Sequence, residues 1–235
     1  VYYQPIYNVK LRQFTHCEAL CRWPNTESSF ISPVEFIPVA EQSGLILELS
    51  HWLVKEVFAC YHSLQEYGFD LNFSINRSPQ EFNSLDHTMR FIALREQYEV
   101  PAKNITLEIT ESLLMSDNNL KTKSFHELKR ECFNFSIDDF GTGYSAISYL
   151  RKYPVESLKI DKSFILSLAS DENDQFMGDC LSFGERCRGR LYCCVTTTCG
   201  QHPTARATFI IRLGWKQDLG CLPENTYKMK SMCSA

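Results

Sequence analysis

The chain has 235 residues, 44% of them hydrophobic, which suits one large domain or one domain with a tail. Its formal net charge of −4 argues against a nucleic acid polymer as partner, and no apolar run approaches the roughly 20 residues that span a bilayer. No signal peptide is visible, so we expect a cytoplasmic protein, or the cytoplasmic part of a membrane-anchored one.

Composition divides the chain near Gln175. Residues 1–175 carry 16 basic and 24 acidic side chains, a net charge of −8, whereas residues 176–235 carry 8 and 4, a net charge of +4. Seven of the eleven cysteines lie in the second part, where hydrophobic periodicity also vanishes. We therefore expect one folded domain over residues 1–175 and an atypical tail, rich in cysteine and arginine, over residues 176–235.

Strands and helices alternate along the first part. Alternating apolar residues predict strands at 2–7, 15–23, 70–74, 104–110, 157–161 and from 133 into the aspartates at 138 and 139. Helical spacing and capping residues predict helices at 32–44, 47–67, 85–97, 112–131 and 145–152, with another beginning at 163. Ser32 precedes Pro33 at the start of the first helix, and Gly44 and Gly68 follow the first two.

The stretch from Phe133 to Ser145 organises this pattern. Its strand ends in Asp138 and Asp139, and the turn Gly141-Thr142-Gly143 follows. Successive strand side chains point to opposite faces, so both aspartates can serve one site only where the backbone turns. Adjacent carboxylates are costly without a cation, a shared proton or solvation. The alternative is a solvated strand-to-helix loop with aspartate as the helix cap.

Polar residues follow nearly every predicted strand. They are Asn76, Glu108, Asp138, Asp139, Lys159 and Asp161. In a β/α barrel the carboxyl ends of the strands form the catalytic face. An open doubly wound sheet would gather its site at one crevice instead of taking a polar group from each strand. The sequence therefore favours a barrel.

The polar set suits a hard cation. Glu18, Asn76, Glu108, Asp138 and Asp139 offer only oxygen ligands, which magnesium, manganese or calcium prefer. A pair of such ions is a standard device for attack of water at phosphorus. Lys159 would orient the water or offset charge, and Arg22 would bind a phosphate. Each residue also has an ordinary structural interpretation: capping for Asp and Asn, a surface pair of Lys159 with Asp161, and a buried ion pair of Glu18 with Arg22.

Seven motifs over residues 1–168 resemble the EAL-domain family of cyclic di-GMP phosphodiesterases. They are YQPI at 3–6, EALCRW at 18–23, ISPVEFIPVAEQSGLI at 31–46, SINRSPQEF at 74–82, LEITES at 107–112, IDDFGTGYSAISYL at 137–150 and LKIDKSFI at 158–165. The resemblance implies a TIM-like β/α barrel that uses Mg²⁺ or Mn²⁺ to hydrolyse cyclic di-GMP to linear pGpG. It also implies cyclic di-GMP, a second copy of the chain and an upstream sensor or GGDEF-type domain as partners.

The resemblance assigns roles by motif position. The metal ligands would be Glu18, Asn76, Glu108 and Asp138, with Asp139 as a ligand of a second metal and Lys159 as the lysine that orients water. Glu111 resembles the glutamate that steadies the loop after the double aspartate, residues 140–145. Gln4 and Arg22 resemble ligand contacts.

The tail departs from the family. Two further strand–helix units, with the motifs Ala-Glu-Gly-Val-Glu and Gln-Gly-Tyr, are missing from residues 176–235. We therefore expect a barrel that is incomplete after the sixth strand, with unpaired edges. The alternatives to an enzyme are an inactive domain that binds cyclic di-GMP or a protein, and a truncated product that does not fold stably.

A frame shift is our hypothesis for the tail, because codons for residues 187–190, read one base later, can spell Ala-Glu-Gly-Val. A native alternative tail and a zinc module are the other interpretations. The zinc module is disfavoured, since Cys193, Cys194 and Cys199 lack paired Cys-x-x-Cys spacing.

Overall fold

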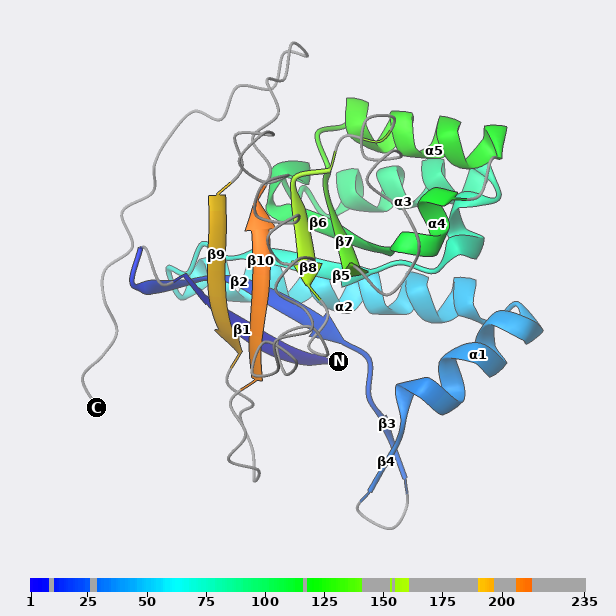
Figure 1. Ribbon diagram of the computed structural model, residues 1–235. Coiled ribbons are helices and arrows are strands. Elements are labelled where there is room, and N and C mark those ends of the chain that lie inside the picture. The colour runs from blue at the N-terminus through cyan, green and yellow to red at the C-terminus, as the bar shows by residue number, and fades with distance from the viewer. Residues whose placement is uncertain are drawn as a thin grey trace, which may run out of the picture.

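Eight strands form a closed barrel (Figure 1). The computed structural model describes residues 1–8, 11–25, 29–115, 118–140, 153 and 155–160, and describes residues 190–196 and 206–212 by their backbone. The strands are β1 (Tyr2–Asn8), β2 (Gln13–Leu20), β5 (Asn72–Asn76), β6 (Ile105–Thr110), β7 (Asn134–Phe140), β8 (Ser157–Ile160), β9 (Arg190–Thr196) and β10 (Arg206–Arg212). Around the barrel their order is β1-β2-β5-β6-β7-β8-β10-β9.

The strands β2, β5, β6, β7 and β8 are parallel to their neighbours in this order, and β1 is antiparallel to β2. The connections from β2 to β5, from β5 to β6 and from β6 to β7 carry helical structure, as the barrel prediction requires. The predicted TIM-like barrel is therefore confirmed. All six predicted strands are present, with ends that differ by a few residues.

The tail supplies the last two strands of the barrel. β10 pairs antiparallel with β8 and with β9, and β9 pairs antiparallel with β1. Among the residues that the structure describes, no parallel strand–helix unit follows β8, the sixth of these strands, as expected. The prediction that the edges of the sheet stay unpaired is wrong, because β10 pairs with β8 and β9 pairs with the last three residues of β1. Two segments of the tail are strands although hydrophobic periodicity vanishes in this part of the sequence.

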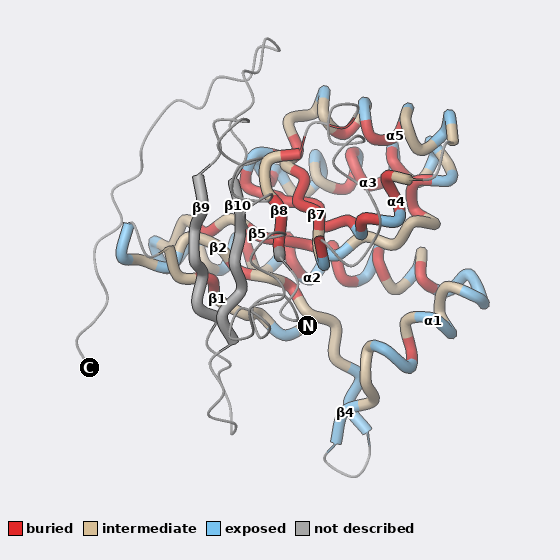
Figure 2. The backbone as a smooth tube through the Cα atoms, viewed as in Figure 1, coloured by how far each residue is buried: buried red, intermediate tan, exposed pale blue. Residues whose placement is uncertain are grey.

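Helices cover the outside of the parallel strands (Figures 1 and 2). They are α1 (Pro33–Ser43), α2 (Ile46–Glu66), α3 (Leu85–Gln97), α4 (Glu111–Met115) and α5 (Asn119–Arg130), with the 3₁₀ turns η1 (Pro79–Phe82) and η2 (Ala102–Asn104). Gly44 and Gly68, with φ of 77° and 80°, follow the first two helices in a left-handed conformation that glycine adopts without strain. Among the described residues, no helix is both long and apolar enough to cross a membrane.

Two predicted elements are divided. The single helix predicted over 112–131 is two helices, because Asn118 caps a new one: its Oδ1 accepts the backbone N–H of Leu120 at 2.8 Å. The strand predicted over 15–23 ends at Leu20, and a separate two-stranded sheet pairs β3 (Trp23–Pro24) with β4 (Phe30–Ile31). The predicted helices at 145–152 and from 163, and the glycine turn at 141–143, lie outside the described residues.

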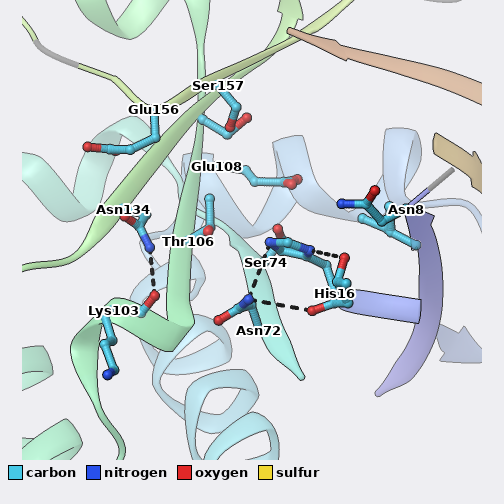
Figure 3. A pocket seen from close by; sticks show the side chains of 13 residues that line it. Asn8, His16, Asn72, Ser74, Lys103, Thr106, Glu108, Asn134, Glu156 and Ser157 are labelled. Atoms are coloured by element: carbon cyan, nitrogen blue, oxygen red, sulfur yellow. Dashed lines mark hydrogen bonds between the residues drawn. The ribbon is translucent and has the colours of Figure 1, made fainter. Parts of the chain in front are cut away.

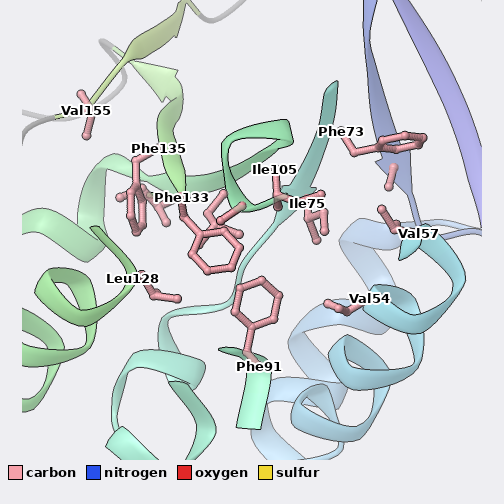
Figure 4. Close-up of a cluster of buried hydrophobic side chains, with 14 of the residues drawn as sticks. Val54, Val57, Phe73, Ile75, Phe91, Ile105, Leu128, Phe133, Phe135 and Val155 are labelled. Carbon is pink, nitrogen blue, oxygen red and sulfur yellow. The ribbon is translucent and has the colours of Figure 1, made fainter. Parts of the chain in front are cut away.

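The hydrophobic core lies between the parallel strands and the helices (Figure 4). Outward side chains of the strands stack on aromatic rings of the helices: Phe135 lies 4.2 Å from Phe125 of α5, between ring centroids, and Phe133, just before β7, lies 5.0 Å from Phe91 of α3. The alternate side chains of the same strands point into the barrel and are polar, which makes this interior available for a site.

Candidate active site

Three strands bring three carboxylates to the carboxyl-terminal end of the barrel. Glu18 lies near the end of β2, Glu108 on β6 and Asp138 on β7. One oxygen from each lies within 4.8 Å of the others. Oxygen ligands sit about 2.0 to 2.6 Å from a hard divalent cation, so ligands on opposite sides of one ion are about 4 to 5 Å apart. The three carboxylates can therefore surround a single ion.

Lys159 of β8 lies among these carboxylates. Its Nζ is 2.7 Å from Glu108 Oε2 and 3.2 Å from both Glu18 Oε2 and Asp138 Oδ1. Lys159 is buried, so the interpretation as a surface pair with Asp161 is wrong, and Asp161 itself lies outside the described residues. One ammonium group thus contacts all three carboxyl groups.

Burial and charge act on this cluster in opposite directions. The pKa of Glu108, which is 2% exposed, is raised to about 8: burial raises it most, Lys159 opposes that, and the charges of Glu18 and Asp138 raise it further. Burial alone would lower the pKa of Lys159, but the three carboxylates outweigh burial and raise it. Lys159 therefore stays protonated and acts as a hydrogen-bond donor.

Two amides border the carboxylates. Asn76 lies at the end of β5, in register with Glu108, and its Nδ2 donates a hydrogen bond to Glu18 Oε1 at 3.2 Å. Gln4 of β1 lies directly opposite Glu18 in the antiparallel ladder, so the two side chains share a face of the sheet. The structure thus places Asn76 and Gln4 beside the carboxylate cluster.

Asp139 is placed differently from its neighbour. The register between β7 and β8 shifts between Ile137 and Phe140, and Asp139 has a φ of 51°. Its backbone N–H donates to Asp138 Oδ1 at 3.1 Å, and its side chain is exposed. The strand is therefore irregular between the two aspartates, where the sequence predicts a backbone turn. Asp139 does not belong to the group of three converging carboxylates, and its role as a second-metal ligand stays a prediction.

Glu111 and Arg22 are the remaining predicted site residues, and neither belongs to the three converging carboxylates. Glu111 is buried at the first position of α4, directly after β6, but the loop that it is predicted to steady, 141–145, is outside the described residues. Arg22 Nη1 donates to the backbone oxygen of Cys21 at 2.9 Å. Glu18 pairs with Lys159 and, within the described part of the chain, not with Arg22, so the predicted alternative of a Glu18–Arg22 ion pair is wrong.

A polar cavity of about 110 Å³ extends into the barrel from Glu108 (Figure 3). Its lining includes His16 of β2, Asn72 of β5 and Asn134 of β7; Asn134 Nδ2 donates to the backbone oxygen of Lys103 at 2.7 Å. These lining residues were not among those predicted from the sequence. A signal was present, because polar residues occupy every second position of several strands: Asn72, Ser74 and Asn76; Thr106, Glu108 and Thr110; Asn134, Ser136 and Asp138.

Comparisons with known proteins agree with this geometry. A family model of the EAL domain matches residues 1–186. MucR of Pseudomonas aeruginosa, described as a bifunctional diguanylate cyclase/cyclic di-GMP phosphodiesterase, is 34% identical over 177 residues, which cover 74% of this chain and 26% of MucR. The signaling protein YkoW of Bacillus subtilis is 35% identical over 187 residues, covering 79% of this chain and 23% of YkoW. The chain thus spans about a quarter of the length of these relatives.

Solved structures show the same fold. The PaMucR phosphodiesterase in its c-di-GMP complex has a TM-score of 0.71 and 31% sequence identity, covering 78% of this chain and 75% of that one. The EAL domain of FimX from Xanthomonas citri in complex with c-di-GMP has a TM-score of 0.67 at 20% identity, which supports the fold alone.

Proposed function

Because the chain belongs to the EAL domain family, we propose that it hydrolyses cyclic di-GMP to linear pGpG with the help of divalent metal ions. The observation that carries the proposal is the convergence of Glu18, Glu108 and Asp138 at the carboxyl-terminal end of a barrel. Relatives named as cyclic di-GMP phosphodiesterases support it. The chain spans about a quarter of the length of such relatives, so their full-length activity is proposed for this protein and is not shown by the match.

The residues at the site fit a hard cation, because the donors are carboxylate and amide oxygens. Glu18, Asn76, Glu108 and Asp138 would hold Mg²⁺ or Mn²⁺, and Asp139 would contribute to a second ion. Bound cations of this kind lower the pKa of a water molecule and neutralise phosphoryl oxygens.

Side chains of the chain would position the reacting groups. In the reaction, the water oxygen bonds to phosphorus, the bond from phosphorus to one ribose oxygen breaks, and that oxygen leaves with a proton. Lys159, held protonated, would donate a hydrogen bond that orients the water or offsets charge on the phosphoryl group. Gln4 and Arg22 would contact the dinucleotide, and Glu111 would steady the loop that follows Asp139.

Turnover by the purified chain with Mn²⁺ and cyclic di-GMP tests the proposal, with pGpG measured by chromatography. We expect Glu18→Ala to lower turnover at least a hundredfold, because it removes one of three converging ligands. Glu66→Ala is the matched control, since Glu66 is an exposed residue at the end of α2, and it should retain activity. Equal turnover in both variants would contradict the assignment of Glu18.

The missing seventh and eighth motifs favour a second candidate function, an inactive domain that binds cyclic di-GMP or a protein partner. Binding of the dinucleotide by the wild-type chain without turnover would support this candidate. A chain that lacks a cooperative unfolding transition would instead support the truncated product.

We further propose that residues 1–175 are the EAL-type part of the chain and that residues 176–235 are an atypical tail, which supplies two strands to the same barrel. We also propose a cytoplasmic location, a second copy of the chain as partner and an upstream sensor or GGDEF-type domain. The gene sequence around codon 176 tests the frame shift: an alternative frame without both missing family motifs would contradict it.

A further inference from the structure

A second cavity lies outside the barrel, between the first turns of α2 and α3. Its volume is about 470 Å³, within the range of small-molecule sites. The residues that matter for its chemistry are His51, Trp52 and Lys55 of α2, Arg77 after β5, and Arg90 of α3. None of the three converging carboxylates lines this cavity.

Positive charge in this cavity is not fully balanced. Lys55 and Arg90 are exposed, and neither makes an ion pair with a described residue. The pKa of His51 is lowered, by burial first and then by Lys55 and Arg90, so both cations act on the same spot. The lining carboxylate Glu48 pairs with neither of them within the described part of the chain.

The other lining carboxylate is already neutralised. Arg77 Nη2 lies 2.5 Å from Glu81 Oε2, and the side chain of Arg77 is only 7% exposed. The guanidinium carbon lies 4.3 Å from the centroid of the Phe91 ring, and Nε of Arg77 is buried without a hydrogen-bond partner. Arg77 is therefore packed in place and prevents Glu81 from neutralising Lys55 or Arg90.

One wall of the cavity is aromatic. Trp52, 43% exposed, lies on α2 one turn before Lys55 and one residue after His51. An exposed indole beside two unpaired cations suits a ligand with a flat ring and an anionic group. Aromatic side chains stack on nucleobases of any sequence, because every base has a π face.

We propose that this cavity binds a nucleoside monophosphate, with Lys55 and Arg90 on the phosphate and Trp52 stacked on the base. Arginine and lysine are common phosphate ligands, arginine through paired hydrogen bonds and lysine as a point charge. The proposal does not depend on turnover of cyclic di-GMP at the barrel.

Isothermal titration calorimetry of the full chain tests the proposal, with AMP, adenosine and inorganic phosphate as probes and with EDTA present to keep metal from the barrel site. We expect saturable binding of AMP, and at least tenfold weaker binding of adenosine because it lacks the phosphate. The double variant Lys55→Gln/Arg90→Gln should bind AMP at least tenfold more weakly than the wild-type chain.

The matched control is Lys123→Gln/Arg130→Gln, which also removes one lysine and one arginine charge, but from the exposed face of α5. This control should bind AMP within twofold of the wild-type chain, and thermal unfolding should show that both double variants are folded. The Trp52→Leu variant should bind AMP no more tightly than it binds inorganic phosphate. The proposal is overturned by an absence of saturable AMP binding, by equal losses in the two double variants, or by adenosine binding as tightly as AMP.

Discussion

Lys159 supplies the positive charge that stabilises the carboxylate cluster when no metal is bound. Its ammonium group lies within 3.2 Å of Glu18, Glu108 and Asp138, and Glu108 is nearly inaccessible to solvent. Charges in such a place are costly unless they are paired. The same side chain that we propose for orienting water therefore also stabilises the fold.

We predict that Lys159→Met lowers the free energy of unfolding by about 3 kcal/mol in EDTA, because it leaves buried carboxylates without a cation. Added Mn²⁺ should recover part of this loss by binding the same carboxylates. Urea unfolding with and without Mn²⁺ measures both effects. Lys123→Met, at an exposed position of α5, is the control, and equal stability of the two variants would show that Lys159 is not needed for charge balance.

Tyr3, Cys17 and Cys60 form a different titratable group, on the α2 side of the barrel. Burial, followed by the proximity of Cys60, raises the pKa of Cys17 to about 11 and also raises the pKa of Tyr3. The Tyr3 hydroxyl donates to the backbone oxygen of Glu56 at 3.1 Å. The folded chain thus favours the neutral forms of these groups.

This group should make the fold sensitive to alkali. A thiol in the unfolded chain ionises near pH 9, so the stability that neutral Cys17 contributes is complete below pH 9 and is lost as the pH rises towards 11. We expect ionisation of Cys17 to lower the free energy of unfolding by about 2 kcal/mol between pH 8 and pH 11. Urea unfolding in reducing buffer should show a shallower pH dependence for Cys17→Ala than for the wild-type chain. Parallel pH profiles would contradict this prediction.

At the scale of elements, α5 shows how a short polar signal decides a boundary. Asn118 precedes the helix and caps it, while Phe125 and Leu128 bury one face against the sheet. The predicted single helix over 112–131 was based on composition, which does not distinguish one long helix from two short ones. The cap was visible in the sequence as an asparagine before an amphipathic run.

We predict that Asn118→Ala lowers the free energy of unfolding by about 1 kcal/mol, because the N–H of Leu120 loses its acceptor. Asn119→Ala is the control, since Asn119 is the exposed first residue of the helix and is not the cap. Thermal and urea unfolding compare the two variants. A cost for Asn119→Ala equal to that for Asn118→Ala would contradict the capping role.

For the whole molecule, closure of the barrel depends on the tail. β10 and β9 join β8 to β1, strands that are far apart in the sequence. Without them, both edges of the sheet would expose unpaired backbone groups.

We predict that a chain truncated after Gln175 forms aggregates or higher oligomers, because its two open edges can pair with other chains. Size-exclusion chromatography with light scattering, compared with the full chain, measures this. A monomeric truncated chain with an unchanged unfolding midpoint would show that the tail strands do not stabilise the barrel.

The sequence by itself determined the six barrel strands, the first three helices and the polar residues at the strand ends, because alternation, helical spacing and capping are local properties. Only the tertiary structure decided which polar residues meet. Lys159 contacts three carboxylates from other strands, Asp139 is not part of their cluster and follows a register shift, and the tail closes the sheet. These outcomes depend on register and closure between strands distant in sequence, which no local pattern encodes.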